Sequence, residues 1–182
     1  MKRKINEIFY SLQGEGYWTG TPMIFVRFSG CNLQCDFCDT EHETFTEMTD
    51  SEILEKISSF PVKRVCLTGG EPALQIDEKF INLLRRNSYF IHIETNGTKE
   101  LPYGINWVTF SPKSGQFALE DANELKIIYR GGNVQHWIRS FEADWFFLQP
   151  CSCQNTAETV QYILDNPEWQ LSIQTHKYLN IR

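Results

Sequence analysis

The chain has 182 residues, of which 41% are hydrophobic, and a formal net charge of −6 at pH 7. This composition is typical of globular proteins and excludes a disordered or collagen-like chain. The length suits a single domain that spans residues 1–182. The negative charge argues against a nucleic-acid partner, because it offers no cationic surface to a phosphate backbone.

Apolar stretches are short throughout the sequence. The longest, 24–28 and 145–148, fall far below the ~20 residues of a membrane-spanning helix, so no membrane association is expected. The opening residues lead into Glu7 and Ser11, which does not resemble a secretory signal. Six unevenly spaced cysteines fit a metal or reactive site in a reducing compartment better than three disulfides. We therefore expect a cytoplasmic protein.

Short β-rich runs alternate with helical patterns along the chain. The expected strands are 24–28, 64–68, 90–94, 107–110, 125–129, 145–149 and 171–174. The first expected helix follows Asp50 or Ser51 as its cap, the second runs from Asp77, and the third begins near Asn155, where Glu158 suggests a capping box and Pro167 ends the pattern. Their expected apolar faces are Ile53, Leu54 and Ile57; Phe80, Ile81, Leu83 and Leu84; and Ala157, Val160, Ile163 and Leu164.

The alternation predicts an α/β fold with a largely parallel sheet, because parallel neighbours need long crossovers that helices usually supply. A closed eight-fold barrel typically takes ~250 residues, with a helix after every strand. This chain is shorter, so we expect a partial, open (β/α) barrel of about six parallel strands and roughly three helices. The chemistry should lie at the carboxyl ends of the strands.

Three cysteines, Cys31, Cys35 and Cys38, follow the first expected strand with the spacing C-x3-C-x2-C. Three thiolates on one loop can hold a 4Fe-4S cluster and leave one iron open to a substrate or cofactor. The alternative is a structural zinc ion with His42 as the fourth ligand. The open position favours the cluster.

The other cysteines carry less information. Cys66 lies within an expected strand, where a buried thiol acting as a small hydrophobe is the simplest interpretation. Cys151 and Cys153 form a C-x-C pair that could hold a metal or an oxidised pair. Nothing close in the sequence completes a site around that pair.

The cysteine triplet, with the aromatic Phe37 before its last cysteine, resembles the signature of the radical S-adenosylmethionine (SAM) enzymes. The stretch 68–72, Thr-Gly-Gly-Glu-Pro, resembles the family's glycine-rich segment beside the methionine moiety. Glycine there lets a backbone approach a ligand closely, although a plain strand-to-helix turn is the alternative. Further similar segments are 7–16, Arg27, 38–40, 111–113, 124–126, 149–150 and 174–179. The resemblance implies a truncated radical SAM barrel and a homodimer.

Within the family, these segments imply the ring contraction of 6-carboxy-5,6,7,8-tetrahydropterin to 7-carboxy-7-deazaguanine with loss of ammonia, a lyase reaction on the route to queuosine. The implied cofactors are a 4Fe-4S cluster, SAM and Mg2+, and the implied partner is an external one-electron reductant. SAM would chelate the open iron and give a 5′-deoxyadenosyl radical that takes hydrogen from C6 of the pterin. The cofactor then performs the difficult chemistry, and the protein positions and shields it.

The resemblance also implies roles for individual residues. Cys31, Cys35 and Cys38 would bind the cluster, and Thr40 would bind Mg2+, which prefers oxygen ligands. The implied SAM contacts are Phe37, Cys38, Asp39, Gly70, Ser111, Pro112, Lys113, Gln149, Pro150, Cys151 and Ser152. The implied substrate contacts are Leu12, Gln13, Gly14, Arg27, Thr68, His176 and the terminal carboxylate of Arg182. No catalytic residue is expected beyond the cofactor ligands.

Arg27 is the most informative of these residues, because an arginine inside an apolar strand is costly to bury unpaired and its planar fork matches a carboxylate. The alternative is an ion pair with an acidic core residue such as Glu94. Structural alternatives also stay open for three residues: a solvated loop for Lys113, a turn cap for Thr40 and a surface position for His176. Candidate acids or bases are Glu15, Glu71 and Glu124.

Cys151, Cys153 and Asn123 depart from the family pattern, but none of them replaces a required ligand. Two rival functions remain at this point. A radical activating enzyme with a protein substrate would leave residues 13–15, Arg27 and residues 174–177 unexplained. A zinc-stabilised binding module would leave the loops 69–72 and 111–113 unexplained.

Overall fold

The computed structural model describes residues 1–41, 43–113 and 115–182. One sheet runs through the described part, with nine strands in the order β3-β1-β2-β4-β5-β6-β7-β8-β9. Its strands are β1 (Lys2–Leu12), β2 (Pro22–Phe28), β3 (Thr46–Thr49), β4 (Arg64–Gly69), β5 (Phe90–Thr95), β6 (Trp107–Phe110), β7 (Asp121–Tyr129), β8 (Glu142–Pro150) and β9 (Gln170–Leu171). The helices are α1 (Asp50–Ser58), α2 (Glu78–Arg86), α3 (His136–Ser140), α4 (Thr156–Asp165) and α5 (Thr175–Leu179), with 3₁₀ turns η1 (Pro72–Leu74) and η2 (Cys151–Cys153).

The sheet confirms the predicted α/β class and the partial, open barrel. Every neighbouring pair from β2 to β9 is parallel, whereas β1 is antiparallel to β2 and β3 is antiparallel to β1. Strands β3 and β9 end the sheet, so it does not close. Three helices have nine or ten residues, as expected, and α3 and α5 have five each.

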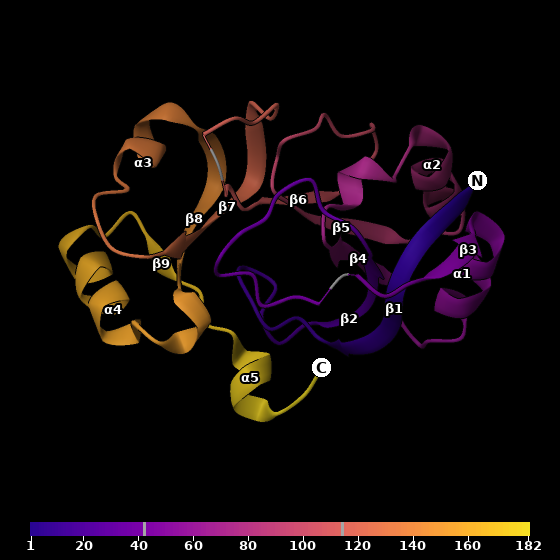
Figure 1. The fold of residues 1–182 in the computed structure, drawn as a ribbon, viewed down its shortest axis with the longest axis horizontal. Coiled ribbons are helices and arrows are strands. Elements are labelled where there is room, and N and C mark those ends of the chain that lie inside the picture. Colours follow the sequence, from indigo (N-terminus) through magenta and orange to yellow (C-terminus); the bar gives the residue numbers. More distant parts are fainter. Residues whose placement is uncertain (42, 114) are drawn as a thin grey trace.

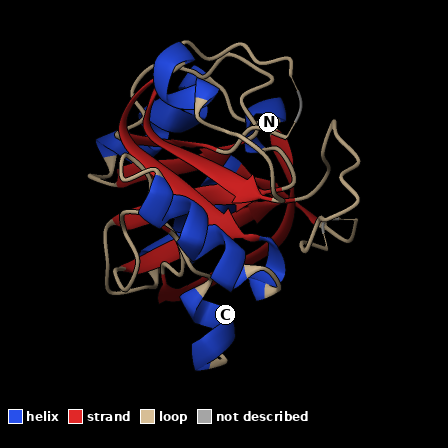
Figure 2. Cartoon of the chain, turned by 90° about the vertical axis from the view of Figure 1, so that its left-hand side faces the viewer, coloured by secondary structure: helices blue, strands red, loops and turns tan. Residues whose placement is uncertain are grey.

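Helices α1 and α2 pack near one end of the sheet, and α3 and α4 pack near the other (Figure 1). The side view shows helices lying across the outer side of the strands (Figure 2). The first pair covers a core that includes Ile53, Phe80 and Leu84, all completely buried. A second core, around Phe110, Leu125, Leu148 and Trp169, lies at the α3 and α4 end. The inner side of the curved sheet is therefore covered by the loops at the strand ends and not by these helices.

Strands β1 and β3 were not predicted. The start of β1 alternates between exposed and buried residues, but its first three positions are the basic Lys2, Arg3 and Lys4, which hide the pattern. Arg3 is completely buried, and it is compensated by Asp50 at 2.7 Å and Asp77 at 3.1 Å. A charge can occupy a core position when such partners surround it.

Helix α1 begins one or two residues earlier than predicted, since its N-cap is Thr49, which forms a capping box with Glu52. The second helix was expected to run from Asp77, and Asp77 is the N-cap of α2, where its side chain accepts from the Phe80 N–H.

The prediction for α4 was wrong in two details. Asn155 makes no capping bond, because its side chain accepts from the Cys151 N–H and donates to the Tyr129 carbonyl. The predicted apolar face of α4 was also partly wrong, since Ala157 is exposed and Leu164 is 71% exposed.

Strand β9 covers only Gln170–Leu171, although 171–174 was predicted. Ser172 still donates its N–H to the Leu148 carbonyl, and the chain then turns toward the loop at residues 13–16. Contacts with that loop therefore replace the strand-to-strand hydrogen bonds that were expected for residues 172–174.

The glycine pair after β4 is required by close backbone packing. Gly69 has a φ of +122°, and a Cβ on Gly70 would lie 2.1 Å from the Gly30 carbonyl oxygen. Gly70 donates its N–H to Phe28, and Glu71 donates to Gly30. The two glycines thus hold the start of the cysteine loop, and Gly70 also lines the cavity described below.

We expect Gly70→Ala to lower the free energy of unfolding by about 1–3 kcal/mol, because the added methyl group meets backbone that cannot yield cheaply. Urea unfolding measures this change. Gly115→Ala is the matched control, since a Cβ there meets nothing within 4 Å. Equal stabilities of the two variants would show that the close approach is unimportant.

Candidate functional site

A cavity of about 1110 Å³ lies at the carboxyl ends of the strands. Its wall includes residues from the ends of β2, β4, β5, β7 and β8 and from the loop after β6. All the predicted site residues line it except Pro112 and Pro150. Pro150 is buried as the last residue of β8. The sheet thus brings together residues that are far apart in the sequence.

The three cysteines of the triplet lie on one loop of this wall and are unpaired thiols. Cys31 and Cys35 are partly buried, and Cys38 is exposed. Burial raises the pKa of the Cys35 thiol, and the charges of Cys38 and Cys31 act in the same direction, so the three thiols lie within electrostatic reach of one another. His42 lies outside the described residues. Three neighbouring thiols that open onto a cavity fit a 4Fe-4S cluster with one free position.

The cysteine loop is held from the other half of the sheet by Arg130, which directly follows β7. The guanidinium forms a bidentate pair with Asp36, at 3.0 and 2.9 Å, and lies 4.7 Å from the centre of the Phe37 ring. A bidentate pair fixes orientation as well as distance. The sequence prediction missed Arg130, although its place at the end of a strand was a usable signal.

Lys113 faces the cavity rather than solvent. Its Nζ donates to Ser111 Oγ at 2.7 Å and lies 5.7 Å from the centre of the Phe37 ring. Burial lowers the pKa of the Lys113 ammonium, and the positive charge of Lys126 adds to this effect. The solvated-loop alternative is therefore wrong, and Lys113 presents a cation to an anionic group in the cavity.

Gln13 and Thr68 meet at Glu94, which the sequence prediction considered only as a partner of Arg27. Gln13 Nε2 donates to Glu94 Oε1 at 3.2 Å, and Thr68 Oγ1 donates to Glu94 Oε2 at 2.8 Å. The amide oxygen of Gln13 accepts from the backbone of Gly14 and Glu15. These bonds fix the 13–15 loop over the end of β5.

Lys126 is 4% exposed in its side chain and is the buried cation of the site. It forms a hydrogen-bonded ion pair with Glu15, and its Nζ lies 3.7 Å from Glu94 Oε1. Burial opposes the charge, but Glu15 and Glu94 outweigh it and raise the Lys126 pKa. Burial would raise the Glu94 pKa, yet Lys126 and His92 hold it at about 2, so both groups are ionised.

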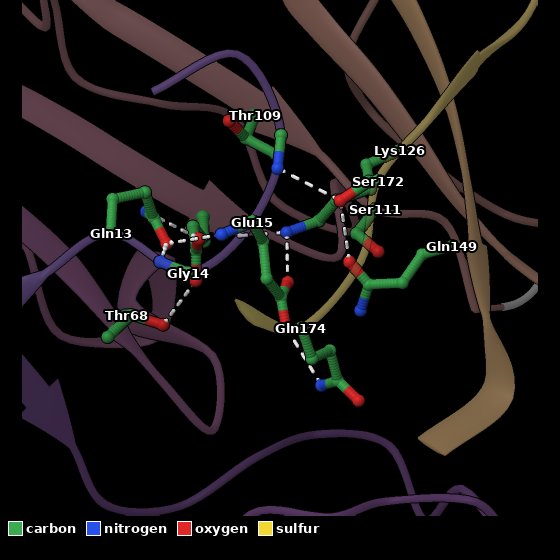
Figure 3. Close-up of polar contacts among 12 residues, drawn as sticks. Gln13, Gly14, Glu15, Thr68, Thr109, Ser111, Lys126, Gln149, Ser172 and Gln174 are labelled. Carbon is green, nitrogen blue, oxygen red and sulfur yellow. Dashed lines mark hydrogen bonds and ion pairs between the residues drawn. The ribbon is translucent and has the colours of Figure 1, made fainter. Parts of the chain in front are cut away.

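The C-terminal segment completes this arrangement. Gln174 donates to Glu15 at 2.8 Å and to Asp39 at 3.0 Å, and Figure 3 shows Glu15 between Lys126 and Gln174. Lys177 also bonds to Asp39, at 2.7 Å. Burial acts to raise the Asp39 pKa, but the bonds from Lys177 and Gln174 hold it below its usual value. The segment thus joins the cysteine loop to the 13–15 loop.

His176 packs directly on Gly14, where a Cβ would lie 2.1 Å from its Nδ1. Gly14 also accepts two hydrogen bonds from Thr175, at 2.9 and 3.0 Å. His176 lines the cavity and is not a plain surface residue.

Arg27 projects into the cavity wall from the end of β2. Its partner among the described ion pairs is Glu7, at 3.0 Å, and not Glu94. Glu7 also bonds to the Arg182 guanidinium at 3.1 Å, and the Arg182 carbonyl accepts from Ser11 Oγ. The chain end therefore reaches the cavity beside Arg27.

Two of the candidate acids have structural contacts. Glu71 is completely buried and accepts from the Asn96 N–H, Thr95 Oγ1 and the Ala73 N–H, which ties the glycine-rich turn to the end of β5. Burial raises the Glu71 pKa. Glu124 accepts from the Tyr17 N–H at 3.1 Å and anchors the far side of the 13–16 loop. Asn96 also lines the cavity and was missed, although it directly follows β5.

At three positions, Cys151, Cys153 and Asn123, the sequence departs from the family pattern. Cys151 lines the cavity and Cys153 is a free, partly buried thiol next to it. Asn123 accepts from the Val108 N–H and donates to Asp144, so the departure at this position serves the sheet. No helix in the described part of the chain combines the length and apolar character needed to cross a membrane.

The shifted pKa of Glu124 predicts that the free energy of unfolding depends on pH. Burial outweighs Lys126 and raises the Glu124 pKa from 4.5 to about 7. The folded chain therefore keeps a proton that the unfolded chain has lost, and the free energy of unfolding should fall as the pH rises through this range, by at most about 3 kcal/mol.

Urea unfolding of the wild type and of Glu124→Gln at pH values across this range measures the effect. Glu124→Gln should reduce the decline, and the exposed control Glu120→Gln should keep it. The same decline in all three proteins would contradict the assignment.

Comparison with known proteins agrees with this geometry. The model of the Radical SAM superfamily matches residues 25–143. A protein named 7-carboxy-7-deazaguanine synthase from Bacteroides thetaiotaomicron is 54% identical over 183 residues, covering 100% of both chains. Its namesake from Haemophilus influenzae is 39% identical, covering 97% of this chain and 93% of that protein.

A crystal structure of QueE from Escherichia coli superposes with a TM-score of 0.81 at 30% identity, covering 96% of this chain and 94% of the other. The family match and the full-length relatives agree with the cysteine loop, the glycine pair and the open parallel sheet. This chain therefore belongs to the radical SAM superfamily, in the family of the 7-carboxy-7-deazaguanine synthases.

Proposed function

We propose that this chain converts 6-carboxy-5,6,7,8-tetrahydropterin to 7-carboxy-7-deazaguanine with loss of ammonia, in the pathway to queuosine. The observation that carries the proposal is the cavity at the strand ends. It collects the three cysteines, Lys113 and Arg27 with the 12–14 segment and the chain end. The relatives that carry the name of this activity match the chain from end to end.

The cysteine set fits a 4Fe-4S cluster, with Cys31, Cys35 and Cys38 as its ligands. When bound, the cluster and SAM supply a carbon-centred radical that removes a hydrogen atom from the substrate. Lys113 would bind a carboxylate or hydroxyl of SAM, with Ser111 holding its ammonium in place. Arg130 holds Asp36 and Phe37 so that the loop keeps its shape.

Arg27 would bind the substrate carboxylate through the donors that its pair with Glu7 leaves free. Thr68, Gln13 and Glu94 form the adjoining polar wall. His176 and the end of the chain at Arg182 close the same side, and Leu12 and Gly14 complete it. The other implied contacts with SAM that line the same cavity are Phe37, Asp39, Gly70, Gln149, Cys151 and Ser152.

We propose Thr40 as a ligand of Mg2+ next to the substrate, since Thr40 lines the cavity next to Asp39 in the chain and its hydroxyl is an oxygen ligand. We also propose a single domain over residues 1–182, a homodimer and an external one-electron reductant. The unpaired thiols of the described cysteines fit the reducing conditions of the cytoplasm.

A small substrate fits this cavity better than the protein substrate of an activating enzyme. The C-terminal segment closes the wall through Lys177 on Asp39, Gln174 on Glu15, and Arg182 on Glu7. A protein loop would have to displace these contacts in order to enter.

The proposal is tested with anaerobically reconstituted, reduced protein incubated with SAM and the carboxytetrahydropterin. We expect 7-carboxy-7-deazaguanine in the wild type by mass spectrometry, and neither cluster nor product in Cys35→Ala, because two thiolates hold the cubane poorly. 5′-Deoxyadenosine without the deazaguanine would instead support the activating enzyme.

Arg27→Ala should raise the KM for the substrate at least about tenfold, because it removes charge-assisted bonds to a carboxylate. SAM cleavage should remain. Steady-state kinetics give the KM, and Arg86→Ala, on the exposed end of α2, is the control. An unchanged KM in Arg27→Ala would remove Arg27 from the substrate site.

A further inference from the structure

A thiol, an imidazole and a carboxylate meet beneath the cavity on two neighbouring strands. Cys66 on β4 stands in register with His92 on the parallel strand β5, and Glu94 lies two residues further along the same face of β5. One ligand atom from each side chain lies within 4.8 Å of the other two. Cys66 and His92 are buried, and Glu94 reaches the cavity wall.

His92 leaves one ring nitrogen without a partner. Its side chain belongs to a residue that is 2% exposed, and Nε2 lies 2.8 Å from Thr109 Oγ1, while Nδ1 is buried without a hydrogen bond. Burial lowers the pKa of His92 to about 4, so the ring is neutral at pH 7. With the proton on Nε2 and donated to Thr109, Nδ1 keeps a free lone pair. Histidines that bind metals usually have this arrangement.

Hydrogen bonds also fix the Glu94 carboxylate, as they fix carboxylates that bind metals. Thr68 and Gln13 donate to its two oxygens and fix its orientation, as second partners of a ligand do. Lys126 is the nearby opposing charge, but it pairs most closely with Glu15. The charged groups that act on Cys66 and His92 are the carboxylates of Glu94 and Glu15 and the cations Lys126, Arg27 and Arg64, so a bound cation would compete with Lys126 for Glu94.

We propose that Cys66, His92 and Glu94 bind a zinc-type divalent cation, at a site separate from the cluster cysteines. One sulfur, one nitrogen and one carboxylate oxygen are ligands that Zn2+ accepts, whereas Mg2+ prefers oxygen alone. The cation enters from the cavity past Glu94. The Cys66 thiol releases its proton to solvent as the metal–sulfur bond forms, so binding strengthens as the pH rises.

The test uses the holoenzyme with its 4Fe-4S cluster assembled, so that Cys31, Cys35 and Cys38 are occupied. One equivalent of zinc chloride is added, and the zinc K-edge absorption fine structure is recorded. We expect a shell with one sulfur and otherwise nitrogen or oxygen ligands. A shell with three sulfurs, or with none, overturns the site, and this result needs no variant.

A matched pair of variants then locates the sulfur. Zinc affinity is measured by competition with a chromophoric chelator, and the iron content and thermal unfolding of each variant are recorded. Cys66→Ser should weaken zinc binding at least tenfold. Cys153→Ser, at a partly buried free thiol outside the cavity wall, should leave it unchanged. Equal affinities overturn the proposal. The product assay is independent of this measurement.

Discussion

A single buried ammonium organises the cavity. Lys126 pairs with Glu15, Glu15 accepts from Gln174, Gln174 donates to Asp39, and Asp39 binds Lys177. This chain of contacts connects β7, the 13–15 loop, the cysteine loop and the C-terminal segment, and its part from Lys126 through Glu15 to Gln174 is drawn in Figure 3. Because an unpaired buried charge is strongly unfavourable, each of these segments is tied to the position of the others.

The cysteine loop depends on two further supports of a different kind. The glycine pair after β4 allows backbone to touch backbone at Gly30, where no side chain fits. Arg130 fixes the loop from outside through Asp36 and Phe37. A loop with three thiols is thus held by contacts from both halves of the open sheet.

The sequence predicted most of the parallel strands because buried strands appear as short apolar runs. The cavity residues were predicted from the resemblance of their motifs to the radical SAM family. The sequence analysis missed a strand where charged residues masked the alternation of apolar and polar positions. The basic residues of β1 concealed a strand, since only the neighbouring Asp50 and Asp77 make Arg3 compatible with the core. Leu164 lies at a helical spacing that predicted burial, but no element covers it.

The amino-acid sequence by itself determined the α/β class, the cysteine triplet and the glycine pair, because periodicity and ligand spacing are local properties of the chain. Only the tertiary structure decided that Glu7 is the partner of Arg27, that Arg130 supports the cysteine loop, and that Lys126 lies between Glu15 and Glu94. It also brought Cys66, His92 and Glu94 together. These pairings join residues from different strands and loops, and the register and curvature of the sheet set their distances.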